Sequence, residues 1–182
     1  MDIQQTDFPG LLIITPRVFS DERGFFKETF QQQRYQEAGI DDPFVQDNFS
    51  RSSQGILRGL HFQIKRPQAK LVFAVRGEIL DVCVDLRKSS PTFGKSFSIT
   101  LTAENHQQLF VPAGFAHGFY VISPQADFMY KCSDYYFPEY ERTLLWNDPA
   151  LEIDWPFTSE PILSEKDKQG LSFNESEIFE TL

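Results

Sequence analysis

The segment that spans residues 50–63 carries the two side chains with the clearest potential for chemistry. Arg58 can bind an anion and His61 can exchange a proton near neutral pH, although the surrounding residues have the pattern of an apolar strand. A strand interior accommodates such groups when it faces a polar cavity. The chain has only 3 histidines, which favours a role for this one. From the segment alone, a core histidine bonded to a carbonyl, with an arginine pointing outward, remains open.

The alternation of a regular strand would separate these two side chains. Leu57, Gly59 and His61 would share one face, and Arg58 and Leu60 would share the other. A bulge at Gly59 would shift the alternation by one residue. We therefore predict an irregularity at Gly59 that turns Arg58 toward the same cavity as His61; unbroken pairing with Arg58 in solvent would contradict this.

Most of the elements that must position these residues are predicted to be short strands. Turn residues such as Gly77, Pro91 and Gly114 separate them. We predict strands at 11–19, 43–51, 56–64, 69–76, 78–86, 95–102, 107–111, 117–122 and 126–133. A helix is expected at 29–38, ending at Gly39, and a short one near 174–180. This pattern predicts an all-β sandwich or barrel in a single domain, residues 1–182.

Composition limits the classes of function. The 182 residues are 41% hydrophobic and carry a formal net charge of −9, so the chain is globular and lacks the basic surface that nucleic acid requires. Cys83 and Cys132 show no CxxC spacing, which indicates free thiols of a reducing compartment. The N-terminus has no signal-peptide pattern, and no apolar run reaches the ~18 residues of a membrane helix. We expect a cytoplasmic protein without nucleic-acid or membrane partners.

Several motifs occur in an order that is specific. They are Asp21–Phe30, Gln46–Ser50, Leu57–Gln63, Lys70, Asp85–Arg87, Gly114–Phe119, Tyr130–Cys132, Trp146–Pro149 and Leu163–Asp167. Over residues 3–170 the chain resembles the dTDP-4-dehydrorhamnose 3,5-epimerase family. The resemblance implies a cupin-type jelly roll with a few short peripheral helices, and a homodimer.

The resemblance also implies a reaction. The substrate would be dTDP-4-dehydro-6-deoxy-D-glucose, epimerised at C3 and C5 to dTDP-4-dehydro-L-rhamnose in dTDP-L-rhamnose biosynthesis. Both protons flank the C4 ketone, so removal of either gives an enolate, and no metal or other cofactor is required. The alternative is an epimerase that acts at C3 only or C5 only in a related deoxysugar pathway.

By the same resemblance, four residues are expected to be catalytic. His61 matches the base, Asp167 its carboxylate partner, Lys70 the group that stabilises the enolate oxygen, and Tyr130 the proton donor. A neutral imidazole is available at physiological pH. Taken singly, Asp167 could be a solvated loop acid, Lys70 an edge lysine and Tyr130 a core tyrosine with a bonded hydroxyl.

The remaining matches are expected to bind substrate. Arg58 would meet the sugar or the diphosphate, His117 would occupy a further substrate-binding position, and Tyr136 would stack on the thymine. The other positions, some of them expected from a neighbouring subunit, are Arg23, Glu28, Gln46, Asn48, Glu141 and Lys166.

Two other classes of protein were compatible with parts of this pattern. A metal-dependent cupin usually has a His-x-His pair, but the residue two after His61 is Gln63, and His61 with His117 would be too few ligands. A module that binds a sugar nucleotide without catalysis would be expected to lack the base or the acid.

Overall fold

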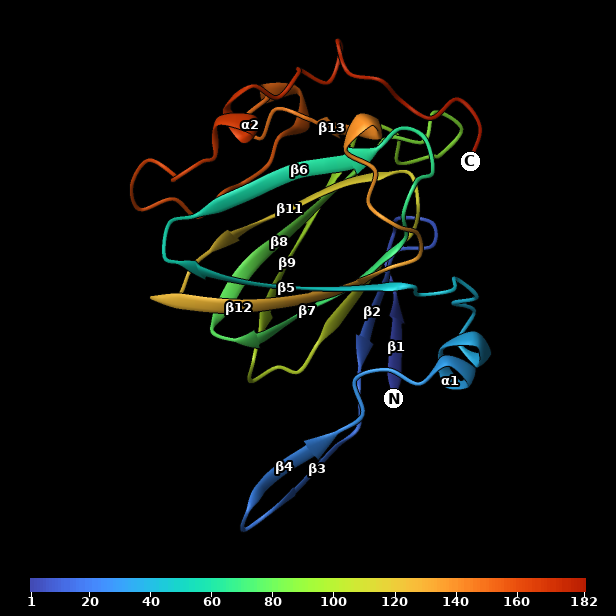
Figure 1. The fold of residues 1–182 in the computed structure, drawn as a ribbon, viewed down its shortest axis with the longest axis vertical. Coiled ribbons are helices and arrows are strands. Elements are labelled where there is room, and N and C mark those ends of the chain that lie inside the picture. The colour runs from blue at the N-terminus through green and yellow to red at the C-terminus, as the bar shows by residue number, and fades with distance from the viewer.

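The computed structural model describes residues 1–182 and contains two antiparallel sheets that face each other (Figure 1). The first has six strands, in the order β1 (Asp2–Gln5), β2 (Leu12–Thr15), β10 (Gln108–Val111), β7 (Lys70–Arg76), β12 (Gln125–Cys132) and β5 (Gln46–Ser53). The second has five, in the order β13 (Glu141–Thr143), β6 (Leu57–Gln63), β11 (Phe115–Val121), β8 (Glu78–Asp85) and β9 (Ser96–Thr102). This is the predicted cupin-type jelly roll.

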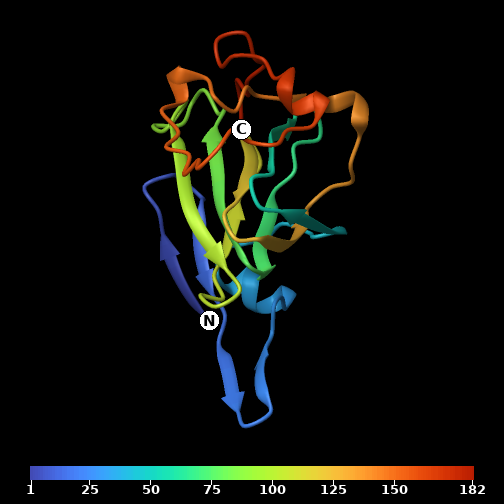
Figure 2. The same ribbon diagram turned by 90° about the vertical axis from the view of Figure 1, so that its left-hand side faces the viewer.

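The remaining elements lie around the two sheets. They are the hairpin of β3 (Val18–Asp21) and β4 (Gly24–Lys27), helices α1 (Gln32–Glu37) and α2 (Glu165–Lys168), and the 3₁₀ turns η1 (Pro138–Tyr140) and η2 (Pro149–Leu151). The hairpin projects from one end of the molecule, and the C-terminal segment lies at the opposite end (Figures 1 and 2). No helix is long and apolar enough to span a membrane.

Three apolar clusters hold these layers together. The largest lies between the sheets and includes Val72, Phe119 and Phe128. A second cluster, which contains Phe62 and Phe179, brings the C-terminal segment onto the outer side of the five-stranded sheet, and a third joins α1 to the six-stranded sheet. Full burial of one such side chain contributes about 1.5–3 kcal/mol. Both sheets are therefore fixed in position from two sides.

Most predicted strands are confirmed, with differences at the ends. The predicted strand 11–19 is interrupted after Thr15, at Pro16, whose ring nitrogen has no hydrogen to donate to a ladder. The helix predicted at 29–38 forms over Gln32–Glu37, and Gly39 follows it with a φ of 84°. The predicted helix near 174–180 is wrong, because Phe179 instead pairs with Arg87 as an extended segment.

Candidate active site

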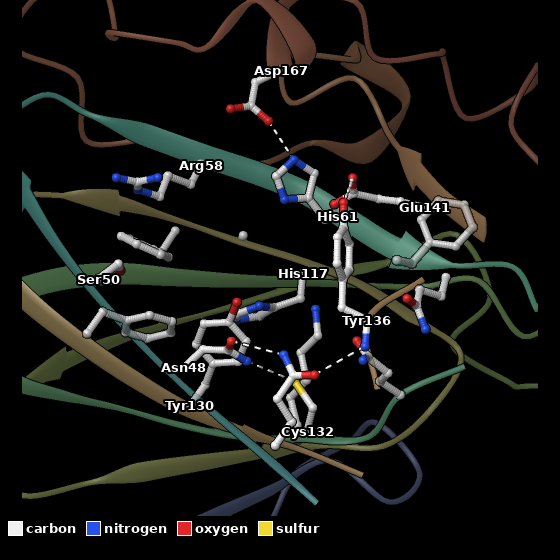
Figure 3. Close-up of a pocket in the computed structure, with 18 of the residues that line it drawn as sticks. Asn48, Ser50, Arg58, His61, His117, Tyr130, Cys132, Tyr136, Glu141 and Asp167 are labelled. Carbon is white, nitrogen blue, oxygen red and sulfur yellow. Dashed lines mark hydrogen bonds and ion pairs between the residues drawn. The ribbon is translucent and has the colours of Figure 1, made fainter. Parts of the chain in front are cut away.

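A cavity of about 680 Å³ opens between the two sheets. It is bounded by β6 and β11 of one sheet and by β5, β7 and β12 of the other, together with Tyr136, Glu141 and α2 (Figure 3). Eleven of the thirteen predicted site residues line it: Gln46, Asn48, Arg58, His61, Lys70, His117, Tyr130, Tyr136, Glu141, Lys166 and Asp167. The volume is within the usual range for a small-molecule site.

The strand that carries Arg58 and His61 is irregular at Gly59, as predicted. His61 pairs with His117 and Arg58 pairs with Phe119. The three residue steps from Arg58 to His61 on β6 therefore lie opposite only two steps on β11, which is a bulge in β6. Gly59 has a φ of 115°, and a Cβ there would lie 2.7 Å from the Gly118 Cα atom. The shift brings Arg58 and His61 to one cavity, where the Arg58 Nε donates to the Ser52 hydroxyl at 3.0 Å.

His61 and Asp167 form a hydrogen-bonded pair. The His61 Nε2 lies 2.6 Å from the Asp167 Oδ1, and the Asp167 side chain is only 4% exposed against 25% for His61. Burial tends to raise the pKa of Asp167, but hydrogen bonds from His61, Ser164 and the Gly59 amide outweigh it and lower that pKa. An ionised Asp167 accepts the Nε2 hydrogen, which leaves the Nδ1 lone pair of a neutral His61 free to take a proton.

Lys70 and Tyr130 approach the cavity from the facing sheet. Alternation along β7 places Lys70 on the same face as Val72 and Ala74, and Tyr130 lies between Phe128 and Cys132 on β12. Burial lowers the pKa of Lys70, although Asp81 and Glu141 oppose that shift. Burial, with the nearby Cys132 and Glu141, raises the pKa of Tyr130 to about 12. The phenol therefore stays protonated and can donate.

His117 has a partner that sequence reasoning missed. Its Nε2 lies 2.9 Å from the Oδ2 of the fully buried Asp81. Burial raises the pKa of Asp81, and His117 and Lys70 partly offset that effect. An isolated carboxylate in the apolar run from Ile79 to Val84 was the signal that could have revealed it.

The same group is the one place where a metal ion could be held. Ligand atoms of Asp81, Cys83 and His117 lie within 4.8 Å of one another, and all three residues are buried. Asp81 is already hydrogen-bonded to His117, and the nearby Lys70 cation opposes a second positive charge. The arrangement therefore fits a buried hydrogen-bonded pair better than a cation site.

A polar network lies beside the His61–Asp167 pair. Glu141 accepts hydrogen bonds from the Tyr136 hydroxyl at 2.9 Å and from the Lys166 ammonium at 2.9 Å. Burial tends to raise the pKa of Glu141, but these bonds and the neighbouring His61 lower it overall. Gln46 accepts from the Tyr136 amide and donates to the Asn48 side chain. These five predicted binding residues are therefore joined, and Tyr136 keeps an exposed ring.

Arg23 and Glu28 are not brought to the cavity of their own chain. Arg23 lies at the tip of the β3–β4 hairpin, where its side chain is 84% exposed and pairs with Asp21. Glu28 pairs with Arg34 at 2.8 Å on the surface. Such exposed pairs contribute little to stability. Within a single chain, both residues lie outside the candidate site.

The fold and the cavity together define an enzyme class. His61 on one sheet faces the Tyr130 phenol and the Lys70 ammonium on the other. A histidine, a phenol and an ammonium can together transfer a proton at a carbon next to a carbonyl and stabilise the resulting enolate. The molecule is thus a jelly-roll protein with an acid–base site.

Comparisons with known proteins identify the family. The model of the dTDP-4-dehydrorhamnose 3,5-epimerase family matches residues 5–175. The enzyme of that name from Pseudomonas aeruginosa is 54% identical over 172 residues, which cover 94% of this chain and 95% of the relative. The chain belongs to the dTDP-4-dehydrorhamnose 3,5-epimerase family, and it is an isomerase.

Two solved structures have the same fold. A dTDP-6-deoxy-D-glucose-3,5-epimerase from Legionella pneumophila, in complex with dTDP-4-keto-L-rhamnose, is 51% identical with a TM-score of 0.94 and covers 97% of this chain and 94% of its own. A 3′-monoepimerase from Streptomyces bikiniensis, in complex with dTDP-quinovose, is 36% identical with a TM-score of 0.86. The match covers 92% of this chain and 85% of the monoepimerase.

Proposed function

We propose that the cavity epimerises dTDP-4-dehydro-6-deoxy-D-glucose at C3 and C5 to give dTDP-4-dehydro-L-rhamnose. One observation carries the proposal: His61 belongs to the five-stranded sheet, and Lys70 and Tyr130 belong to the facing six-stranded sheet across one cavity. Inversion of a carbon requires that a proton leave from one face of the sugar ring and return to the other. Groups on opposite sheets meet that requirement for a ring bound between them.

In the proposed mechanism, the Nδ1 of His61 removes the proton from C3 or C5. The electron pair of the C–H bond moves to the C4 oxygen, and Lys70 stabilises the enolate charge. Asp167 stabilises the imidazolium that forms. Tyr130 then donates its proton to the same carbon from the other side of the ring, and the carbonyl re-forms.

We propose that the remaining lining residues bind the rest of the substrate. Arg58 would bind the sugar or the diphosphate, since a guanidinium pairs well with phosphate oxygens, and His117 would contact another part of the substrate. The exposed ring of Tyr136 is free to stack on thymine. The other members of this set are Gln46, Asn48, Glu141 and Lys166.

The test of the function is proton NMR of dTDP-4-dehydro-6-deoxy-D-glucose with the enzyme in heavy water. We expect deuterium to enter at both C3 and C5, and the L-rhamno product to accumulate. Exchange confined to C3 or to C5 would instead support the single-centre alternative, for which the monoepimerase relative is a precedent within this fold. Absence of exchange at both carbons would refute the proposal.

We further propose that the enzyme is a homodimer in which each hairpin completes the partner's cavity. Phe19, Phe25 and Phe26 on the β3–β4 hairpin are exposed, and the hairpin extends away from the sheets (Figure 1). A cluster of exposed aromatic side chains favours burial against another molecule. In such a dimer, Arg23 at the hairpin tip and Glu28 after it could contribute to the nucleotide site of the second subunit.

Mixed dimers test this arrangement. We expect Arg23→Ala to weaken substrate binding about 10- to 100-fold, because a charged hydrogen bond to phosphate is lost, and His61→Ala to be inactive. Refolding the two variants together should restore about a quarter of wild-type activity, since half of the dimers would then hold one complete cavity. If confirmed mixed dimers showed no recovery of activity, Arg23 would instead act on the cavity of its own chain.

We also propose that the enzyme acts in the cytoplasm. Cys83 and Cys132 are both free and buried. Unpaired thiols of this kind are typical of a reducing compartment.

A further inference from the structure

Asp167 does not reach His61 from a long helix or from a strand. It lies on the four-residue helix α2, in a segment that is fixed at both ends to the five-stranded sheet. Before α2, the Ile162 carbonyl accepts from the Leu57 amide of β6 at 3.0 Å; after it, the Leu171 amide donates to the Thr143 carbonyl of β13 at 3.0 Å. These bonds place the backbone of α2 next to β6, but they do not fix the side-chain rotamer of Asp167.

The Ser164 hydroxyl supplies that missing restraint. It donates to the Asp167 Oδ2 at 2.6 Å and accepts from the Asp167 amide at 3.2 Å. The other carboxylate oxygen, Oδ1, accepts from the His61 Nε2 at 2.6 Å and from the Gly59 amide at 3.4 Å. Both oxygens are thus occupied, and the carboxylate cannot rotate without losing hydrogen bonds to Ser164, His61 or Gly59.

We propose that Ser164 is a positioning residue for the His61 base, an inference that rests on the proposed function. Ser164 holds the Asp167 carboxylate in one rotamer, and Asp167 holds the imidazole with its Nδ1 toward the substrate. Ser164 lines the cavity, but its hydroxyl hydrogen is already committed to Asp167. It therefore acts through its neighbour and not as a direct ligand of the sugar.

The chain provides a matched control. Ser172 also donates its hydroxyl to a carboxylate three residues later, Glu175, at 2.5 Å, but this pair is exposed and outside the cavity. Ser164→Ala and Ser172→Ala therefore remove the same kind of hydrogen bond, and only the first one supports the catalytic pair.

The experiment compares Ser164→Ala, Ser164→Thr and Ser172→Ala by steady-state epimerisation of the 4-keto sugar. We expect Ser164→Ala to lower kcat about tenfold, as loss of a hydrogen bond to a charged group predicts, with KM changed less than about twofold because ground-state binding is intact. Ser164→Thr, which keeps the hydroxyl, should recover most of the rate. Ser172→Ala should match the wild type, and thermal melting should show that all variants are folded.

A second readout does not depend on turnover. In protein labelled with ¹⁵N-histidine, the wild-type His61 should show the Nε2–H tautomer, and Ser164→Ala should show a mixture of tautomers. A wild-type kcat in Ser164→Ala would overturn the proposal, and so would a raised KM with unchanged kcat, which would make Ser164 a substrate ligand. An inactive wild-type enzyme would refute the proposed function, whereas an equal kcat in the wild type and in Ser164→Ala would refute only the role of Ser164.

Discussion

His61→Ala will bind dTDP but will no longer exchange the C3 and C5 protons of the 4-keto sugar with heavy water. The imidazole Nδ1 is the group in the cavity that a buried, ionised Asp167 leaves free to accept a proton. Loss of a general base typically slows a reaction about 10²- to 10⁴-fold, and we expect the upper end because the enolate cannot form without it. NMR measures the exchange, and calorimetry measures the nucleotide affinity.

The nucleotide affinity and the melting temperature serve as controls for this variant. The His61 side chain is partly exposed to the cavity, so its truncation leaves little buried void and both quantities should stay near their wild-type values. If exchange continued at a near-normal rate, another group would have to be the base. His117 would be the first candidate, because it is the other histidine that lines the cavity.

The strand geometry at the centre of this site could be predicted from the sequence because its signals are local. Gly59 between two polar side chains in an apolar strand indicated a break in alternation, and the paired register of β6 and β11 confirms it. Alternation along β12 likewise placed Phe128, Tyr130 and Cys132 on one face, which lines the cavity. In each case the geometry follows from the period of two in a strand.

What could not be predicted depends on contacts between distant segments. No regular sequence pattern distinguishes Asp167 from a solvated loop acid. Asp167 nevertheless forms a hydrogen bond with His61, which lies 106 residues earlier in the chain. The C-terminal residues near Phe179 have some helical character in sequence, but their amide and carbonyl groups bond to Leu86 and Lys88 instead. Tertiary contacts override weak local propensity in both segments.

The β3–β4 hairpin is another element that could not be predicted from the sequence. The pairs from Val18↔Lys27 to Asp21↔Gly24 form a small separate sheet, and its strands are only four residues long. The sequence predicts a strand that ends at residue 19 and a helix that begins at residue 29, with no strand between them. Phe19, Phe25 and Phe26 stay exposed although Phe19 contacts Phe26 and Phe25 contacts His106. Under the proposed dimer, the second subunit would bury them.

Lys70→Met will lower kcat without lowering the melting temperature. The ammonium makes no ion pair or hydrogen bond within the protein and lines the cavity, so its donors are available to an enolate oxygen. Removing one preorganised donor of this kind typically costs about 10²- to 10³-fold in kcat. Met has similar length and keeps the apolar contacts of the stem. We therefore expect kcat to fall by this factor, with dTDP affinity unchanged.

The same substitution should leave the melting temperature equal to or above that of the wild type. Burial lowers the pKa of Lys70, so below that folded-state pKa the charged lysine costs the folded protein stability. As pH rises from there to the unfolded value of ~10.4 the cost disappears, and the advantage of Lys70→Met should therefore be largest near neutral pH and shrink in alkaline solution. Lys88→Met, which removes an exposed pair with Glu180, is the control and should change neither rate nor stability appreciably. A marked loss of stability in Lys70→Met would mean that the ammonium is a structural partner of Asp81 and not a group held ready for the enolate.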